Sequence, residues 1–402
     1  MRWEKISLRE VADFRNGINF DKSAYSSGVK LIGVSNFGER FSPDYEELQE
    51  VDPKVVRSDD FLIDGDIVFV RSNGNKELVG RCMLITEPEY SVTYSGFCIR
   101  ARIRDTNQYD PTFFTYYFKS SAFRKALSGN AVGTNIQNLS QDRLSSHIAY
   151  VPTIEMQRKI ASVLSAYDDL IENNQKQIKL LEEAAQRLYK EWFVDLRFPG
   201  HETTPIVDGV PEGWKQDTIN SIIELQSGFA FKSADFCDSG TYKIVTIKNV
   251  QDGLFDGKNV SKINDIPARM PPHCRLNDGD ILLSLTGNVG RVCVVNGQDY
   301  LLNQRVAKIK SDYPVYAYCL FRSSDMFTSM GNLANGAAQQ NLSPIKTGQI
   351  KTLIPSVSLL IRFEVTASAY LKQMLNLNKQ IELFQQARDR LLPKLMNGEI
   401  EV

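Results

Sequence analysis

The sequence predicts an α+β protein in which two mixed α/β domains are joined by two long helices that form an intramolecular coiled coil. Apolar residues recur at alternating steps of four and three over residues 154–198, and the pattern returns over residues 357–402. The segments that precede the two helices share short motifs in the same order. We therefore expect an internal repeat, with one domain and one long helix in each copy.

The first long helix is predicted over residues 154–198, because no Gly or Pro lies between Thr153 and Phe198. About 40 residues at 1.5 Å each give a rod of roughly 60 Å. We call the row of positions that packs against the partner helix the seam. Its members in this helix are Ile160, Leu164, Tyr167, Ile171, Asn174, Ile178, Leu181 and Leu188. Asn174 is the polar member, and a buried asparagine typically sets the register of such a pair.

The second long helix is predicted about 203 residues further along the chain, over residues 357–402. Arg388 interrupts its seam once, Pro393 should kink the last turn, and Asn397-Gly398 can end the helix. The seam residues here are Phe363, Tyr370, Met374, Leu377, Ile381, Phe384 and Leu391.

The two domains are expected over residues 1–153 and 199–356, and a linker at residues 197–210, which the first copy lacks, leads into the second. Each opens with apolar residues at i, i+3 and i+6, which predicts a short helix. Each continues with Gly-x-x-Phe, a strand after Asp-Gly, an aromatic helix, a polar loop that ends in Asn-Leu-Ser, and a last strand. The polar loops are residues 133–140 and 336–343. They are either a shared contact surface or ordinary turns, and Asn-Leu-Ser could simply begin the last strand.

Composition limits the classes of protein that fit. Of the 402 residues, 42% are hydrophobic and 24% charged, which is typical of a globular protein. No apolar run approaches 18 residues and the N-terminus has no apolar signal core, so we expect a cytoplasmic protein without membrane contact. Six scattered cysteines and three histidines predict buried thiols rather than a metal site. The net charge of −1 argues weakly against nucleic acid, although it can hide local patches.

No catalytic motif stands out. The sequence contains no phosphate-binding loop, no dinucleotide fingerprint, no zinc-binding helix and no motif of amino-methylating enzymes. Asp52-Pro-Lys54 and Asp256-Gly-Lys258 resemble the end of a nuclease motif, but they lie at unrelated points of the repeat. We therefore expect a non-catalytic chain with no metal and no cofactor of its own.

Polar residues near the shared motifs suit contact with duplex DNA, because amides, hydroxyls and guanidinium groups read base edges. Arg100 and Arg102 alternate along a strand and so share one face, which could meet phosphates or equally be solvated. The candidate DNA-binding residues are Lys22, Arg71, Ser72, Asn73, Lys76, Arg81, Arg100, Arg102, Thr134, Asn135, Gln137, Lys232, Lys248, Thr286, Asn288, Arg291, Asn303, Gln304, Arg305, Gln339 and Gln340.

Together these features resemble the specificity subunit of a type I restriction–modification enzyme, over nearly the whole chain. The resemblance rests on the order of Gly-x-x-Phe, Gly-Asp-Ile and the Gly-to-Asn-Leu-Ser loop, with a proline before each long helix. Trp192-Phe193 and residues 391–400 end the two helices in the manner of that family. The resemblance implies a pseudo-twofold repeat of two target-recognition domains, each reading half of a bipartite, asymmetric DNA site. The two helices would be antiparallel and set the spacer between the half-sites.

The resemblance also implies partners. Two methyltransferase subunits would dock on the helices and carry S-adenosylmethionine, and restriction/translocase subunits would bring ATP and Mg. Two alternatives stay open. The chain could be the recognition part of a split methylating restriction enzyme of another type, or a coiled-coil scaffold that binds proteins and no DNA.

Overall fold

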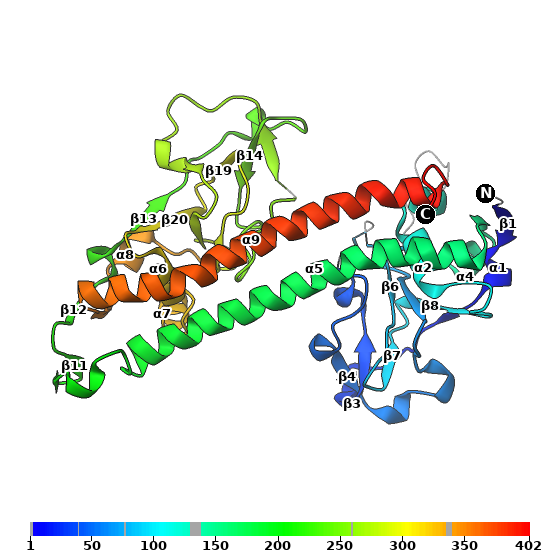
Figure 1. Ribbon diagram of the computed structural model, residues 1–402, viewed down its shortest axis with the longest axis horizontal. Helices are drawn as coiled ribbons and strands as arrows, with labels where there is room; N and C mark the ends of the chain where they lie inside the picture. The colour runs from blue at the N-terminus through cyan, green and yellow to red at the C-terminus, as the bar shows by residue number, and fades with distance from the viewer. Residues whose placement is uncertain (1–2, 39, 76–77, 129–137, 259, 335–339) are drawn as a thin grey trace. The chain divides into compact units, whose positions relative to one another are not determined.

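The structure is a computed structural model that describes residues 3–38, 40–75, 78–128, 138–258, 260–334 and 340–402. It has the mixed α/β character that the sequence predicts. The chain divides into two compact units, which we treat separately. Unit 1 comprises Met1–Ile171 and Leu383–Val402, and unit 2 comprises Glu172–Glu382. The long helices α5 (Ile154–Tyr189) and α9 (Val357–Met396) each contribute one segment to either unit (Figure 1).

Unit 1 is built on a four-stranded antiparallel sheet in the order β2-β8-β5-β6, beside a three-stranded sheet β4-β3-β7 and the pair β1-β9. Its strands are β1 (Glu4–Ser7), β2 (Ala12–Asn16), β3 (Tyr25–Ile32), β4 (Gln49–Val51), β5 (Ile67–Val70), β6 (Cys82–Leu84), β7 (Val92–Tyr94), β8 (Cys98–Ile103) and β9 (Ile148–Val151). Its shorter helices are α1 (Leu8–Val11), α2 (Pro111–Lys119), α3 (Ser121–Ser128) and α4 (Gln141–Ser145).

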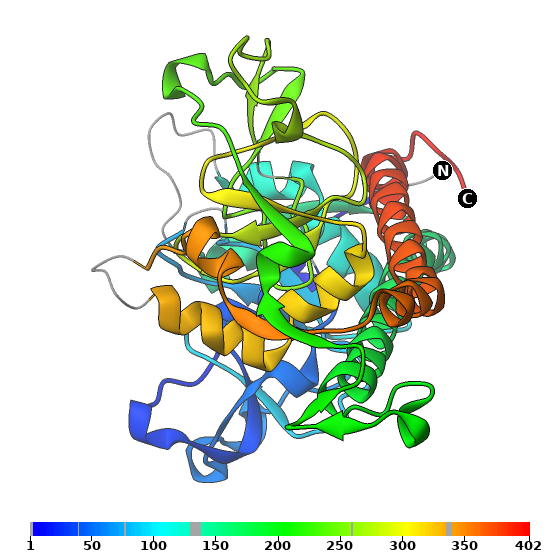
Figure 2. The same ribbon diagram turned by 90° about the vertical axis from the view of Figure 1, so that its left-hand side faces the viewer.

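Unit 2 has a four-stranded antiparallel sheet in the order β13-β20-β17-β18, a second sheet β15-β14-β19-β16, and the pairs β12-β21 and β10-β11. Its strands are β10 (Ile206–Val207), β11 (Val210–Pro211), β12 (Lys215–Thr218), β13 (Ile223–Ser227), β14 (Tyr242–Val245), β15 (Ser261–Ile263), β16 (Arg275–Leu276), β17 (Ile281–Ser284), β18 (Val292–Val294), β19 (Tyr300–Leu302), β20 (Val306–Ser311) and β21 (Lys351–Ile354). Helices α6 (Pro314–Phe321), α7 (Ser324–Ala334) and α8 (Pro344–Gly348) lie together at one end of the unit, away from β14 and β19 (Figures 1 and 2).

The strand after each Asp-Gly turn is buried on both faces, which explains its continuous apolar run. Successive side chains of a strand point to opposite faces. In β5, Ile67 and Phe69 therefore join the core that contains α2, while Val68 and Val70 join the core of the small sheet. These strands fix the middle of each unit, and their ends position the loops described below.

The opening segments differ from the prediction of a single short helix. Residues 4–16 form strand, one helical turn and strand, and residues 215–227 repeat this with a 3-10 turn at Ile219–Ser221. The buried Leu8 and Val11 lie in the helical turn of the first copy. Pairing of the flanking residues with β9 and β8 satisfies more backbone groups than a helix of this length could.

The Asn-Leu-Ser sequences do not begin the last strand, so that alternative is wrong. Ser140 Oγ accepts a 3.2 Å hydrogen bond from Arg143 N and caps α4. Ser343 Oγ likewise accepts from Lys346 N at 3.4 Å and caps α8. Serine favours this position because its hydroxyl satisfies a backbone N–H that the first helical turn leaves without a partner.

In unit 1 the long helices run antiparallel. Lys159 Nζ donates to Val402 O at 3.5 Å, and Arg388 pairs with Asp168. The residue numbers of the partners therefore rise along α5 as they fall toward α9 from the C-terminus, which is the antiparallel order. Arg388, which interrupts the apolar pattern, therefore makes a polar contact between the helices. The side chains of Arg388 and Asp168 are only 17% and 12% exposed. The hydroxyl of Tyr116 from α2 donates to the same carboxylate.

In unit 2 the same two helices are also antiparallel. Asn174 Nδ2 donates to Gln380 Oε1 at 3.0 Å, and the rings of Tyr189 and Phe363 lie 6.4 Å apart. Past Tyr189, α5 gives way to a π-helical turn, Lys190–Val194, earlier than the predicted end at residue 198. In unit 1, α9 continues through Pro393 to Met396, and Gly398 follows with φ 73°, which confirms the predicted ending.

Candidate nucleic-acid interface

Four segments that are far apart in the sequence meet at one edge of unit 1. The residues just after β5 lie between the turn that precedes β8 and the loop that precedes α4. Arg71 N donates to Phe97 O at 2.8 Å, and Leu139 N donates to Arg71 O at 2.8 Å. The Gly-x-x-Phe loop joins them, because Ile18 N donates to Tyr94 O at 3.0 Å. The structure thus gathers the shared sequence motifs at one place, residues 17–20, 71–72, 95–97 and 138–139, which we call the meeting point of unit 1; the equivalent segments of unit 2 form its own meeting point.

Unit 2 contains the same arrangement with other side chains. Leu285 N donates to Arg305 O at 3.0 Å, and Leu342 N donates to Leu285 O at 2.7 Å. Phe229 N donates to Leu302 O at 2.9 Å, as Ile18 does to Tyr94 in unit 1. Thr286 pairs with Asn341 through an isolated bridge, and Ser72 pairs with Asn138 in the same way.

The glycine that opens Gly-x-x-Phe in both copies has a steric explanation. A Cβ on Gly17 would lie 2.3 Å from the carbonyl oxygens of Tyr94 and Ser95. A Cβ on Gly228 would lie 2.2 Å from Asn303 O. Only glycine allows the loop to pack directly on the backbone of the neighbouring turn.

The candidate residues divide by position. Ser72, Thr286, Asn303, Gln304 and Arg305 lie at the two meeting points, and Arg71 lies there with its guanidinium donating to Gly96 O at 3.1 Å. Arg81 and Arg291 flank the same strand ends, where their carbonyls accept from Val70 and Ser284. The others that the structure describes lie in neighbouring loops and short helices, namely Lys22, Asn73, Lys232, Lys248, Asn288 and Gln340. Lys76, Thr134, Asn135, Gln137 and Gln339 lie outside the described residues.

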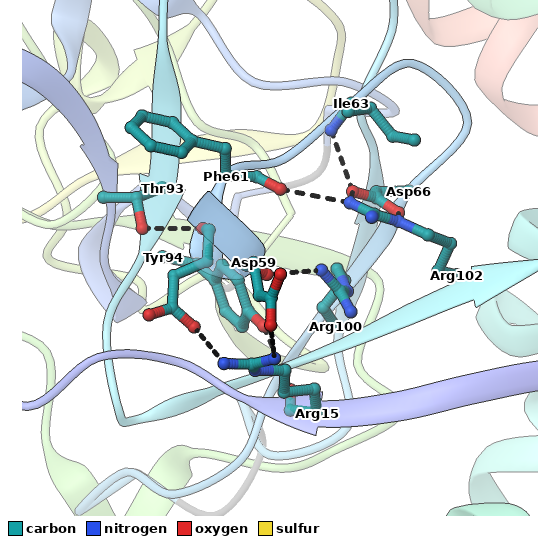
Figure 3. A network of polar contacts seen from close by, with 10 residues as sticks. Arg15, Asp59, Phe61, Ile63, Asp66, Thr93, Tyr94, Arg100 and Arg102 are labelled. Carbon is teal, nitrogen blue, oxygen red and sulfur yellow. Dashed lines mark hydrogen bonds and ion pairs between the residues drawn. The ribbon is translucent and has the colours of Figure 1, made fainter. Parts of the chain in front are cut away.

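Arg100 and Arg102 are engaged within unit 1, an arrangement that differs from the solvent-facing row the sequence suggests (Figure 3). Arg100 is 6% exposed, and its Nη1 donates to Asp59 O at 3.0 Å. Arg102 donates hydrogen bonds of 2.7 Å to both carboxylate oxygens of the fully buried Asp66. This hydrogen bond raises the pKa of Arg102 above its usual value. Both arginines hold residues 59–66 against the sheet.

Two residues at the meeting points escaped the sequence reasoning. Phe97 is 62% exposed at the tip of its turn and was not among the candidate residues. Asn341 is exposed beside Thr286. Aligning residues 95–97 with 303–305 in the internal repeat would have pointed to Phe97, since its counterpart Arg305 was already a candidate.

We also searched the part of the chain that the structure describes for metal sites, membrane-spanning helices and paired cysteines. Among these residues, no group of three or more His, Cys, Asp and Glu side chains could hold a metal ion. No described helix is both long enough and apolar enough to span a membrane. The six cysteines are free thiols, and all except Cys237 are buried.

The fold is that of a type I restriction–modification S subunit of known structure. The crystal structure of a type I restriction–modification system S subunit from M. genitalium is similar, with a TM-score of 0.55 and 17% identity, over 98% of this chain and 96% of that one. The profile of the type I restriction modification DNA specificity domain matches residues 1–183 and 211–356. This chain belongs to that family.

Curated relatives agree. The chain is 25% identical to the type I restriction enzyme MjaIX specificity subunit of Methanocaldococcus jannaschii, over 72% of this chain and 69% of that protein. It is 21% identical to the HindI specificity subunit of Haemophilus influenzae, over 99% of both chains.

Proposed function

We propose that this chain selects the DNA sequence for a type I restriction–modification complex, with each unit reading one half of a bipartite, asymmetric site. The observation that carries the proposal is the site built twice. The same backbone hydrogen bonds join equivalent segments in both units, while the side chains they present differ. A common frame with different side chains is what two unlike half-sites require.

The proposed organisation follows the sequence. Residues 1–153 and 199–356 are target-recognition domains, and residues 154–198 and 357–402 are spacer helices. We propose that the helices form an intramolecular antiparallel coiled coil and that the halves are related by a pseudo-twofold repeat. Antiparallel helix contacts within each unit support the first point, and the matching strand orders support the second. The length of the helices would then fix the distance between half-sites, as protein geometry fixes half-site spacing in other DNA-binding proteins.

DNA contact would combine two kinds of interaction. Phosphate contacts hold a protein in register, and contacts to base edges select the sequence. We assign these roles to the side chains at the two meeting points and in the loops beside them, and not to Arg100 and Arg102. Those two arginines are held by backbone and carboxylate oxygens of unit 1, so a phosphate would have to displace Asp66 from Arg102.

We propose that the chain is cytoplasmic and acts without catalysis of its own. Two methyltransferase subunits would dock on the helices and bind S-adenosylmethionine, and restriction/translocase subunits would bind ATP and Mg. Membership of a specificity-domain family supports this division of labour.

The proposal can be tested by single-molecule sequencing of adenine methylation in a methylation-free host. The host would express the methyltransferase encoded beside this chain, with and without the chain. We expect a split motif with an undefined spacer only when this chain is present. An identical methylation pattern in both strains would contradict the proposal, as would a soluble complex that methylates nothing.

A further inference from the structure

Each meeting point contains a four-residue turn of the same construction. In unit 1 the turn is Ser95–Cys98, closed by Cys98 N donating to Ser95 O at 2.8 Å. In unit 2 it is Asn303–Val306, closed by Val306 N donating to Asn303 O at 2.9 Å. The third position is Phe97 in one turn and Arg305 in the other.

The backbone holds both third residues firmly. Phe97 O accepts from Arg71 N at 2.8 Å and from Ser72 N at 3.3 Å, and the preceding Gly96 N donates to Ile18 O at 2.6 Å. Arg305 O accepts from Leu285 N at 3.0 Å, and the preceding Gln304 N donates to Phe229 O at 3.0 Å. A side chain at this position is therefore presented from a fixed point on the sheet, as a recognition site needs.

Both Phe97 and Arg305 are exposed. Phe97 is 62% exposed, whereas the phenylalanines of α2 and α3 in unit 1 are buried. The guanidinium of Arg305 makes no hydrogen bond or ion pair with any residue that the structure describes, whereas Arg102 and Arg322 are ion-paired. Equivalent rigid turns thus present an exposed aromatic residue in one unit and an exposed arginine in the other, each at the place where the shared motifs come together.

We infer that Phe97 and Arg305 are equivalent specificity-determining residues that select different bases in the two half-sites. This inference rests on the proposed function. Arginine recognises guanine by donating two hydrogen bonds to its O6 and N7, whereas an apolar side chain such as phenylalanine contacts the methyl group of thymine. Arg305 would select a G·C pair in the half-site read by unit 2, and Phe97 would select a T·A pair in the half-site read by unit 1.

The test compares methylation motifs for the full chain and its variants, each expressed with the methyltransferase. The variants are Arg305→Gln and Phe97→Ala, because glutamine pairs with adenine in the same bidentate way and alanine removes the ring. Arg269→Gln changes an exposed arginine elsewhere in unit 2 and serves as the matched control. Arg305→Gln should change one G·C preference to A·T in one half-site. Phe97→Ala should relax the preference for T·A at one position of the other half-site, while Arg305→Gln should lower discrimination in favour of G·C by about 5- to 100-fold.

The outcomes distinguish failure of the proposed function from failure of the assignment of Phe97 and Arg305. If the wild-type chain gives no split motif, the proposed function itself is contradicted. A wild-type split motif that neither variant alters, or variants that alter the same half-site, would overturn the assignment of Phe97 and Arg305. If a variant methylates too little DNA for a motif to be determined, DNA binding is measured instead. Its complex is then tested against duplexes in which one base pair at a time is substituted. Loss confined to one base pair supports the assignment, and uniform loss overturns it.

Discussion

Asn174 of α5 and Gln380 of α9 are joined by a 3.0 Å hydrogen bond between their side-chain amides in unit 2. Asn174 is 5% exposed, and the apolar Ile171 and Ile178 precede and follow it in the seam. A polar pair at such a position fixes which residues of the two helices face each other, because any shift leaves the buried amide without a partner.

The pair should be energetically coupled. Asn174→Ala should lower the free energy of unfolding by about 1 kcal/mol, and the double variant with Gln380→Ala should cost less than the sum of the two single changes. Denaturant unfolding of the four proteins measures the coupling. Asn173→Ala, at the exposed neighbouring position, is the control and should be nearly neutral. Strict additivity would show that the hydrogen bond contributes nothing.

Gly17→Ala should damage the site of unit 1. The new Cβ would meet backbone carbonyls at 2.3 Å, so the loop or the turn must move, at a cost of about 1–3 kcal/mol. Thermal unfolding measures this cost, and methylation sequencing should show one half-site degraded while the other stays intact. Gly74→Ala is the matched control, since nothing lies within 4 Å of its Cβ position. Equal effects of both substitutions would refute the steric explanation.

Arg102→Ala should affect stability and not DNA recognition. It leaves the fully buried carboxylate of Asp66 without its cation, which costs about 3–5 kcal/mol. Arg104→Ala removes an exposed ion pair with Asp13 and should cost less than about 1 kcal/mol. DNA binding measured against salt concentration provides the second readout. A salt slope reduced by about one for Arg102→Ala would instead identify a phosphate contact.

Matched insertions in the long helices should lengthen the spacer. Seven residues inserted after Asn174 and seven inserted before Gln380 keep these two residues opposite each other, preserve the seam pattern and add about 10 Å, or roughly three base pairs. Methylation sequencing should show both half-sites unchanged and the gap between them wider. The same insertion in the linker at residues 197–210 is the control and should leave the gap as it was. An unchanged gap with helix insertions in place would rule out the helices as a ruler.

The long helices could be predicted from the sequence, because their signal is redundant. The long helices follow from many seam residues, and Asn174 stood out only against that background. The prediction of a short helix for the opening segments was wrong, because Leu8 and Val11 can be buried equally well in one helical turn between strands. Whether a lone helix or a sheet forms there depends on the distant strand β9, which no local pattern reveals.

The candidate site was predictable in its location and not in its details. Alternation along β8 correctly places Arg100 and Arg102 on one face, but it cannot show that residues 59–66 cover that face. Phe97 was missed because aromatic residues usually lie in a core. Exposure is a property of the assembled loops, and only the structure brings residues 17–20, 71–72, 95–97 and 138–139 together.

The six thiols offer a practical advantage. Burial raises the pKa of Cys82 to about 11 and that of Cys98 to about 12, so neither forms the reactive thiolate at neutral pH. Cys237 is the only one of the six with a partly exposed side chain. A maleimide dye should therefore attach to unit 2 at a single native position, which would let fluorescence follow this unit on DNA without engineering the protein first.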